Sequence, residues 1–547
     1  MNPRYTFLLI ALFSSASLFA QSTLTRVYEI FEAKCTGCHG HVDPEAGLDL
    51  EGVGATANER ALDVYGHLFG VIPANADAAA KGFQYIYPGR PDRSFLFRKV
   101  NHGLEPLIEL GAAEGDPMPK DEPPLSEVER ELIRQWVLFG AKPVQTVIDE
   151  QLLVDYYGGQ GLASFDTPPP APDPSEGFQI KMGPFFLAPA GEPLDEREFF
   201  QKYELDLPEA LEVYRMELLF SSYSHHFILF DYDSPSVAQN VAPGFRPEPY
   251  HQGISYTAAV QEPTDLLLPQ GTAFLWGENM VLDLNSHYIN YSANQVYQAE
   301  VYVNVYTQPS GTAAQEMQTT LFANFDIYIP NDGDLHTFSK TVNSNSGEVF
   351  LWGLMGHTHK YGKGYKVYRR TGGQQGELLY DASCPQGIPG CVSPYFDYQH
   401  IPMRLFAPLQ PLTINPANGF IHEASWLNYG PEDVWYGPTS DDEMMLLVAM
   451  FTFDDEGVVI ADAKETAHSL PGVRVSPNPA DDRLVVSLPE NTGPVELQLF
   501  DALGRQVLKQ EGAETLEVSR NNLPAGWYLY RVRDEDGRLA VGKLVFE

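Results

Sequence analysis

A long run of strand-like segments, from about Phe178 to Asp455, most limits what this chain can fold into. Segments such as YRMELLFSS, QAEVYVNVYT, VFLWGLMG and MMLLVAMFTF are separated by Gly, Pro, Asn and Asp turns. This spacing is typical of β-sandwiches and barrels. Because the block is long for one sandwich, we expect two comparable β domains, residues 178–315 and 316–460, divided near TQPSGTAAQEMQ.

The segments on either side of this block differ from it in composition. Residues 21–145 are polar and helical, and LSEVERELIRQWVLFGA is the clearest helix, with Ser126 as its N-cap and Glu129 three residues later. Residues 146–177 include FDTPPPAPDPSEG, which predicts a stiff linker or a chain wrapping a surface. Residues 470–547 read as a small all-β module with Pro-Asn-Pro and Asp-Gly turns.

The N-terminus predicts export. Arg4 precedes the apolar run FLLIALFSSASLFA, so residues 1–20 read as a signal peptide cleaved after Ala20. The run is too short to span a membrane comfortably, and no other stretch reaches its length, so we expect no transmembrane span in the mature chain. The formal net charge of −38 argues against nucleic acid and anionic membranes as partners.

The four cysteines form two pairs, and export permits disulfides. Cys384 and Cys391 close the short Gly- and Pro-rich loop CPQGIPGC, for which a structural disulfide is the favoured interpretation and a two-cysteine metal site the alternative. Cys35 and Cys38 stand in CTGCH, a motif in which two thiols bond a haem covalently and the adjacent His39 ligates its iron. The alternative there is a disulfide beside an uninvolved histidine.

A second axial ligand of the haem is expected downstream, and a thioether is common in that position. Met118 lies in the proline-rich stretch GDPMPKDEPP, directly before the predicted helix. From about Leu24 to Lys142 the arrangement resembles small c-type cytochromes, which usually carry such a methionine. The competing ligands are His41, His67 and His102.

Histidines in the β block fall into three groups beside strand-like runs, namely His225-His226, His287, and His357 with His359. The others are scattered: His251, His336, His400 and His422. Alternate residues of a strand point to one face, so His-x-His can aim two imidazoles at one metal. The adjacent His225 and His226 can do so only if the backbone twists or bulges.

The order and spacing of these motifs, from about Phe178 to Asp455, resemble the copper type II, ascorbate-dependent monooxygenases. Peptidylglycine α-hydroxylating monooxygenase and dopamine β-monooxygenase are the best-known members. The shared motifs are His-His before ILF, HY after an apolar strand, HTH before a glycine-bearing strand, and TSDDEMMLL near the end. The family has two jelly-roll-like β domains, each holding one copper, which face each other across a solvent-filled cleft.

The resemblance implies the ligands of two copper ions. One copper would use His225, His226 and His287. The other would use His357, His359 and Met444, the catalytic set, because the family's methionine follows an Asp-Glu pair. Met445 is the adjacent rival, and the apolar pattern of that strand does not choose between the two.

A thioether softens a copper site towards Cu(I), so the copper with methionine is the expected place for O2 to bind and be reduced. The all-histidine copper would store and pass an electron. A monooxygenase needs two electrons from outside per turnover, and the fused cytochrome domain suggests that the haem delivers them from an external donor.

This chain differs at two positions from the family members that amidate peptides, so we do not expect it to catalyse peptide amidation. Met355 stands two residues before His357, where the amidating members carry an arginine that anchors the peptide carboxylate. Val448 stands where they carry a tyrosine. We therefore expect a small organic or peptide-like substrate of unknown identity, hydroxylated at a C–H bond. The alternatives are a non-enzymatic haem and copper electron-transfer protein, and a surface binding protein that retains the fold.

The last module, with VSPNPADDRL, LFDALGRQV, LPAGWYLYRV and GKLVFE, resembles the C-terminal sorting domain of the type IX secretion system. The alternative interpretation of this module is an accessory β domain with no role in sorting. The predicted fold is multidomain: a small all-α cytochrome c domain, two consecutive jelly-roll-like β-sandwich copper domains, and a small C-terminal β-sandwich. The resemblance implies type IX secretion, after haem attachment in the periplasm, to the medium or the cell surface.

Overall fold

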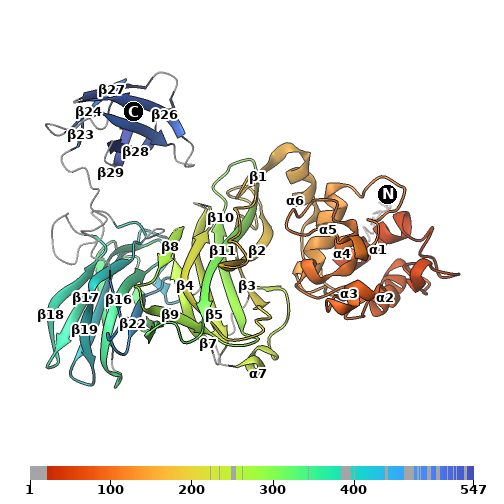
Figure 1. Cartoon of the computed structure of the whole chain (residues 1–547), viewed down its shortest axis with the longest axis horizontal. Helices are drawn as coiled ribbons and strands as arrows, with labels where there is room; N and C mark the ends of the chain where they lie inside the picture. Colours follow the sequence, from red (N-terminus) through yellow and green to blue (C-terminus); the bar gives the residue numbers. More distant parts are fainter. Residues whose placement is uncertain are drawn as a thin grey trace, which may run out of the picture. The chain divides into compact units, whose positions relative to one another are not determined.

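The computed structural model describes residues 21–547 except 222, 233, 248–253, 261–262, 343, 384–395, 399–400, 438–440, 461–472, 477–479, 481, 489–493, 501–505, 514, 521–522, 525, 535–538 and 547. The predicted signal peptide, residues 1–20, therefore lies outside the described residues. The chain forms two compact units, residues 1–458 and 459–547. It is a β-rich multidomain protein, and helices α1 to α6 are drawn in red and orange in Figure 1.

The helical region begins the first unit. Its helices are α1 (Thr23–Lys34), α2 (Ala57–Leu68), α3 (Ala76–Ala80), α4 (Phe95–Val100), α5 (Glu127–Leu138) and α6 (Glu150–Asp155). The predicted N-cap of α5 is confirmed, because Ser126 accepts from the backbone N–H of Glu129 and the Glu129 side chain accepts from that of Ser126. The apolar face of α5 packs Trp136 and Ile133, both fully buried, against α1.

The proline-rich segment is partly structured and wraps the sheet that follows. Within residues 146–177 lie α6 and β1 (Gly161–Ala163), and β1 pairs in parallel with β11. The carbonyl oxygens of Pro169 and Pro170 accept hydrogen bonds from Gln179 and Asn304, at 3.1 Å each. The prolines carry no N–H to pair, so these two residues bond to the sheet through their carbonyls.

Two large sheets follow in the first unit (Figure 1). The seven-stranded sheet contains β1, β2 (Gly177–Leu187), β4 (Leu211–Leu219), β8 (Thr264–Leu267), β9 (Thr272–Trp276), β11 (Val296–Pro309) and β12 (Gln315–Glu316). The nine-stranded sheet has the order β19 (Arg404–Ile414), β16 (Gly347–His357), β22 (Leu446–Thr452), β13 (Gln318–Ala323), β7 (Ile254–Val260), β5 (Ser224–Tyr232), β10 (Val281–Ile289), β3 (Glu196–Glu204), β6 (Phe245–Arg246). A short helix, α7, spans Pro235–Ala238.

The nine-stranded sheet connects the two halves of the β block. Strands β3, β5, β6, β7 and β10 come from the first half, and β13, β16, β19 and β22 from the second. In the described part of this sheet the halves meet at one paired position, Thr319 of β13 opposite Tyr256 of β7. The predicted boundary at 315/316 falls inside β12, which pairs with β9 of the first half.

The second half is completed by a four-stranded sheet and a two-stranded ladder. The four-stranded sheet has the order β15 (Leu335–Thr341), β20 (Gly419–Leu427), β17 (Gly362–Thr371), β18 (Gln374–Asp381). The ladder pairs β14 (Tyr328–Ile329) with β21 (Val434–Trp435). Between this sheet and the strands of the second half lies a core with Trp426, Tyr365, Tyr380 and Phe420, each at most 1% exposed.

One buried histidine of this core titrates far from its usual range. Nδ1 of His422 on β20 forms a hydrogen bond with the Tyr365 hydroxyl, at 2.7 Å, and burial lowers the pKa of the His422 imidazole to about 4. The unfolded chain therefore binds this proton more readily, between about pH 4 and pH 6.5. The free energy of unfolding should be highest above pH 6.5 and fall as the pH drops, losing up to about 3 kcal/mol at pH 4.

Replacing His422 with phenylalanine should remove that part of the pH dependence. We expect the variant to lose less stability than the parent between pH 6.5 and pH 4, by up to about 3 kcal/mol, in urea unfolding. His336→Ala is the matched control, because His336 is partly exposed and bonds Asp332 at 2.9 Å. An unchanged slope in His422→Phe would show that His422 is not the titrating group.

The helical region packs directly on the first half of the β block. Phe139 beyond α5 contacts Phe199 of β3 and Phe245 of β6, with ring centroids 5.2 Å apart in each pair. The backbones of Gly140 and Gly244 lie so close that a Cβ on Gly244 would come within 2.3 Å of the Gly140 nitrogen. Glycine is therefore required at this contact.

A buried network of charges crosses the same interface. Arg134 of α5 pairs with Glu105 at 3.1 Å, and Lys181 of β2 pairs with both Glu105 and Glu300. Removing one member would leave an uncompensated buried charge, which is strongly destabilising. The network therefore couples the position of α5 to that of β2.

The second unit contains two small sheets. One has the order β23 (Arg474–Ser476), β24 (Arg483–Ser487), β27 (Thr515–Ser519), and the other β26 (Gln506–Gly512), β25 (Val495–Phe500), β28 (Gly526–Asp534), β29 (Leu539–Phe546). Leu484, Val486, Leu497 and Leu544 are fully buried in the core that the two sheets share. Alternate apolar residues of β24, β25 and β27 are buried, as the sequence pattern predicts for a β-sandwich.

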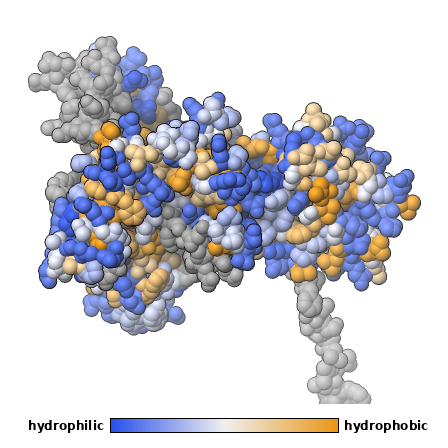
Figure 2. Space-filling model, turned by 60° about the horizontal axis from the view of Figure 1, so that its bottom comes forward, coloured by the Kyte–Doolittle hydropathy of each residue, from blue (hydrophilic) through white to orange (hydrophobic). Residues whose placement is uncertain are grey.

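Figure 2 shows hydrophobic residues scattered in small groups among hydrophilic ones on the face that it presents. Among the described residues, no helix is long and apolar enough to cross a membrane.

Candidate functional site

Five histidines from three strands and one turn form a buried group, the histidine cluster. His225 is its centre, with its ring centroid 5.1 Å from that of His287, 5.5 Å from His357 and 5.6 Å from His359. His226 lies 5.3 Å from His287 and 5.7 Å from His357. The cluster therefore joins all three histidine groups that the sequence analysis selected.

A local irregularity of the sheet allows His225 and His226 to face the same cluster. In the pairing of β10 with β5, His287 lies opposite His226, but the next residue, Tyr288, lies opposite Ser224. His225 is therefore the extra residue of a bulge. This is the distortion that adjacent histidines require if both are to serve one site.

The side chains of the cluster form two ligand groups whose donor atoms lie within 4.8 Å of one another. The first ligand group is His225, His357 and His359, and the second is Glu198, His226 and His287. The resemblance had placed His225 with His226 and His287. In place of two sites facing across a solvent-filled cleft, the structure brings both groups into contact, and all five histidines are at most 9% exposed.

Glu198 and its neighbour Glu196 are the residues of this site that the sequence analysis missed. Both come from β3, which pairs with β10 so that Glu198 lies opposite His287. Oε1 of Glu196 lies 2.8 Å from Nε2 of His287, and Oε1 of Glu198 lies 3.6 Å from Nε2 of His226. In the segment EREFFQKYE nothing distinguishes these two glutamates from other charged residues of a strand. Their place at the site follows only from the register in which β3 pairs with β10.

The imidazoles are in the state that metal ligands require. Burial, reinforced by the neighbouring imidazoles, holds the pKa of His225, His226 and His357 well below the usual value, so these rings are neutral at pH 7. Both ring nitrogens of His225 and Nδ1 of His226 and His287 have no hydrogen-bond partner among the described residues. Buried polar atoms without partners are costly, and a bound cation would satisfy them.

A buried carboxylate shapes the turn that carries His359. Glu443 accepts hydrogen bonds from the backbone N–H of His359 at 2.8 Å and of Tyr361 at 2.7 Å, and from the indole N–H of Trp426 at 2.8 Å. Burial raises its pKa to about 7, against the lowering effect of these donors. The Asp-Glu pair before the predicted methionine ligand therefore holds the His-x-His segment in place.

The structure separates the two candidate methionines. Met445 is fully buried in the core of the second half, and its sulfur lies 3.4 Å from the amide nitrogen of Asn324. Met444 is partly buried and points elsewhere, since adjacent residues of an extended chain face opposite sides. Met445 thus belongs to the core, and the assignment of Met444 as a ligand stays a prediction.

The CTGCH motif opens onto a cavity in the helical region. Cys35, His39 and Met118 all line it, together with apolar side chains such as Phe31, Leu50, Phe95 and Leu125. Nδ1 of His39 lies 3.2 Å from the carbonyl oxygens of both Glu45 and Leu48, so Nε2 is the ring nitrogen that could ligate a metal. Cys35 and Cys38 are free thiols, so they form no disulfide with each other.

The three competing histidines do not line this cavity. His41 bonds the carboxylate of Asp49 at 2.8 Å, His67 is exposed on α2, and Nε2 of His102 lies 2.8 Å from the carbonyl oxygen of Met118. His102 thus contacts the backbone of the predicted ligand rather than replacing it. Several predictions lie outside the described residues: Cys384, Cys391, His251 and His400.

The comparisons with known proteins concern mainly the second unit. Residues 474–547 match the family described as the secretion system C-terminal sorting domain. This confirms the type IX sorting domain predicted from the last module, and with it export, interaction with that secretion machinery, and secretion or attachment at the cell surface. No curated protein matches the chain.

Several solved structures show low likeness to the chain. CopC from Methylosinus trichosporium OB3b is 20% identical, with 14% of this chain and 83% of CopC covered and a TM-score of 0.11. A β-glucuronidase from Ruminococcus gnavus is 11% identical, with 66% of this chain and 46% of the enzyme covered and a TM-score of 0.13. The capsid protein P2 of bacteriophage PM2 is 6% identical, with 49% of this chain and 99% of P2 covered and a TM-score of 0.20.

Proposed function

We propose that this exported chain is a haem- and copper-containing monooxygenase that inserts one oxygen atom of O2 into a C–H bond of an organic substrate. The observation that carries the proposal is the convergence of five buried histidines from both halves of the β block on one point. The sequence resemblance to the copper type II monooxygenases, in the same residues, supports the reaction class.

The donor sets fit copper. Imidazole suits copper in both oxidation states, and copper binds nitrogen and oxygen sites more tightly than the other divalent first-row metals. His225, His357 and His359, with Met444, would hold one ion, and His226, His287 and Glu198 would hold the other. Copper bound there would supply O2 binding and single-electron steps. The two jelly-roll-like copper domains and the cytochrome c domain belong to the same proposal.

The residues around the clusters hold the ligands in orientation. Glu196 accepts from the ring of His287, and Glu443 accepts from the backbone of His359. Such outer partners fix the ring orientation and raise the basicity of the ligand nitrogens. The buried, closed position of the cluster also excludes water from the reacting atoms.

The cavity behind CTGCH fits a covalently bound haem c. Cys35 and Cys38 would form the thioether bonds, and His39 and Met118 would be the axial ligands. A haem held this way would supply single electrons, taken from an external donor. Strand β3 supports delivery to the cluster, because it contacts the helical region through Phe199 and the histidines through Glu196 and Glu198.

The deep burial of the cluster favours one alternative, a non-enzymatic electron-transfer protein. His225 and His359 are only 2% and 1% exposed, which suits a closed centre that never meets a substrate. The two functions differ in their use of O2. An electron-transfer protein would carry two copper ions and one haem but incorporate no oxygen into any product.

The decisive experiment is a screen of organic compounds with the haem- and copper-loaded chain, a reductant and labelled O2. We expect a product that contains one labelled oxygen atom, and we expect His357→Ala to abolish its formation. His336→Ala is the matched control, because His336 belongs to the same half of the β block but bonds only Asp332. Labelled product at undiminished rate in His357→Ala would refute the copper assignment.

A further inference from the structure

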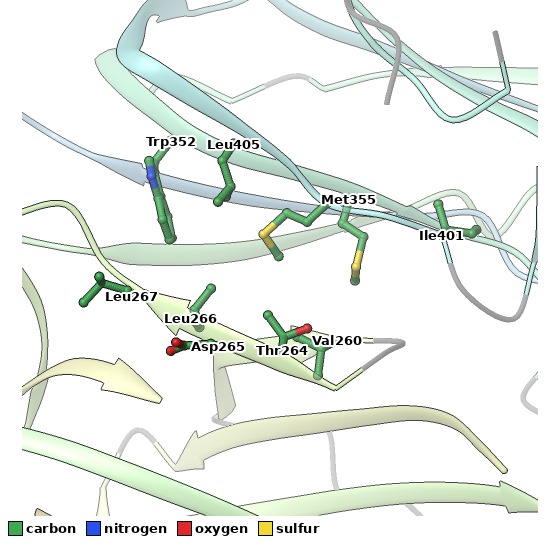
Figure 3. Close-up of a pocket in the computed structure, with 10 residues that line it drawn as sticks. Val260, Thr264, Asp265, Leu266, Leu267, Trp352, Met355, Ile401 and Leu405 are labelled. Carbon is green, nitrogen blue, oxygen red and sulfur yellow. The ribbon is translucent and has the colours of Figure 1, made fainter. Parts of the chain in front are cut away.

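A cavity of about 170 Å³ lies beside the histidine cluster, between β7 and β8 on one side and β16 and the start of β19 on the other. Figure 3 shows Val260, Leu266, Trp352, Met355 and Ile401 converging on it. We call it the Met355 cavity. Its lining is mainly apolar, with two thioethers, from Met355 and Met403.

Strand β16 links the Met355 cavity to the histidine cluster, and strand β5 carries a second residue of the adjoining apolar group. Met355 precedes His357 by two residues on β16, so both side chains lie on one face, about 7 Å apart along the strand. Ile228 follows His226 by two residues on β5. Met355 and Ile228 pack in the same apolar group as Met403, so β16 and β5, two of the three strands that carry the histidine cluster, each contribute a side chain to this group.

A bulge in β16 brings a third wall to the cavity. Trp352 and Met355 are three residues apart and would face opposite sides of a regular strand. The pairing of β16 with β19 and with β22 shifts register between Leu351 and Gly353. The shift turns the indole of Trp352 to the same side as Met355, and both line the cavity.

The charges at the cavity exclude an anionic group. Among the described lining residues, Asp265 is the one ionisable side chain, and its carboxylate oxygens accept from Nε and Nη2 of Arg215, at 2.8 and 2.9 Å. The part of the lining that the structure describes holds no cationic side chain, so a carboxylate placed there would lose water without gaining a cationic partner from it.

We propose that the Met355 cavity binds an uncharged, compact apolar group of the substrate, an aryl ring or a branched alkyl group, next to the C–H bond that reacts. This inference rests on the proposed monooxygenase function. An apolar protein cavity of about 150 Å³ is known to hold one benzene molecule, so a group of roughly six to ten heavy atoms fits. The cavity thus selects for shape and lack of charge.

The test measures binding without catalysis, so that it can fail independently of the proposed function. Ethylbenzene and phenylacetate are titrated into the haem-loaded, copper-loaded chain without reductant, with methionine methyl groups isotopically labelled for NMR. We expect ethylbenzene to shift the methyl signals of Met355 and Met403 and to bind at least 10-fold more tightly than phenylacetate. If ethylbenzene binds in this way but no oxygenated product is found in the screen with labelled O2, only the proposed reaction is overturned.

The second part of the test repeats these titrations with variants of Met355. Met355→Arg should weaken ethylbenzene binding at least 10-fold and improve phenylacetate binding, with the copper content unchanged, and Met355→Leu should change ethylbenzene affinity less than 3-fold. Tighter binding of phenylacetate than of ethylbenzene by the parent chain would overturn the inference. The inference would also be overturned if ethylbenzene bound to the parent chain without shifting either methionine signal. That measurement uses the parent chain, so it does not depend on whether a variant folds.

Discussion

Replacing His225 with alanine is expected to remove copper from the first ligand group and to weaken the second. His225 lies within ring contact of His287, His357 and His359, and its two nitrogens are without partners among the described residues. The expected result is that the purified chain retains at most one of two copper ions. Metal analysis of the copper-loaded, dialysed protein measures it.

The same variant distinguishes the two assignments of His225. If His225 belongs with His357 and His359, the electron paramagnetic resonance spectrum of His225→Ala should match that of His359→Ala. If it belongs with His226 and His287, as the family resemblance implies, the spectrum should match that of His287→Ala. His336→Ala, which changes a histidine away from the cluster, should keep both ions and the parent spectrum. Full copper content in His225→Ala would contradict both assignments.

Replacing Cys35 and Cys38 together with serine is expected to abolish covalent haem attachment. Serine cannot form the thioether bonds, so denaturation and extraction should leave the chain colourless, whereas the parent chain should keep its haem absorbance. The cavity lined by Cys35, His39 and Met118 gives the physical basis for this expectation. Haem that stays bound to the denatured double variant would refute the attachment.

The axial ligand is tested by the reduction potential. Met118→His should keep the haem and lower its potential, by tenths of a volt at most, because a thioether raises the potential relative to imidazole and axial ligands span about 0.8 V in all. His67→Ala changes an exposed competitor that does not line the cavity and should leave the potential unchanged. A shift in His67→Ala, with none in Met118→His, would move the ligand assignment to His67.

The sorting domain adds a condition for any of these experiments. It indicates export, so the functional protein acts after secretion or at the cell surface. Covalent haem attachment and copper loading should therefore be checked on protein recovered from the exported fraction.

The sequence by itself determined the features that depend on neighbouring residues. Helix α5 begins after the Ser126 and Glu129 capping box, because its bonds span only three residues. The turn-separated apolar segments gave the β-rich block, and the last module was identified as the sorting domain, which the family match confirms. The CTGCH motif could be selected because its residues are adjacent in the chain.

Only the tertiary structure decided which residues meet. The grouping of His225 with His357 and His359, the approach of Glu198 to His226, and the wall that Trp352 adds to the Met355 cavity depend on strand register and on bulges in β5 and β16. Register is set by pairing between segments far apart in the chain, and one extra residue reverses which face a side chain takes. The period of the sequence pattern does not carry that information, so the ligand types were predictable and their partners were not.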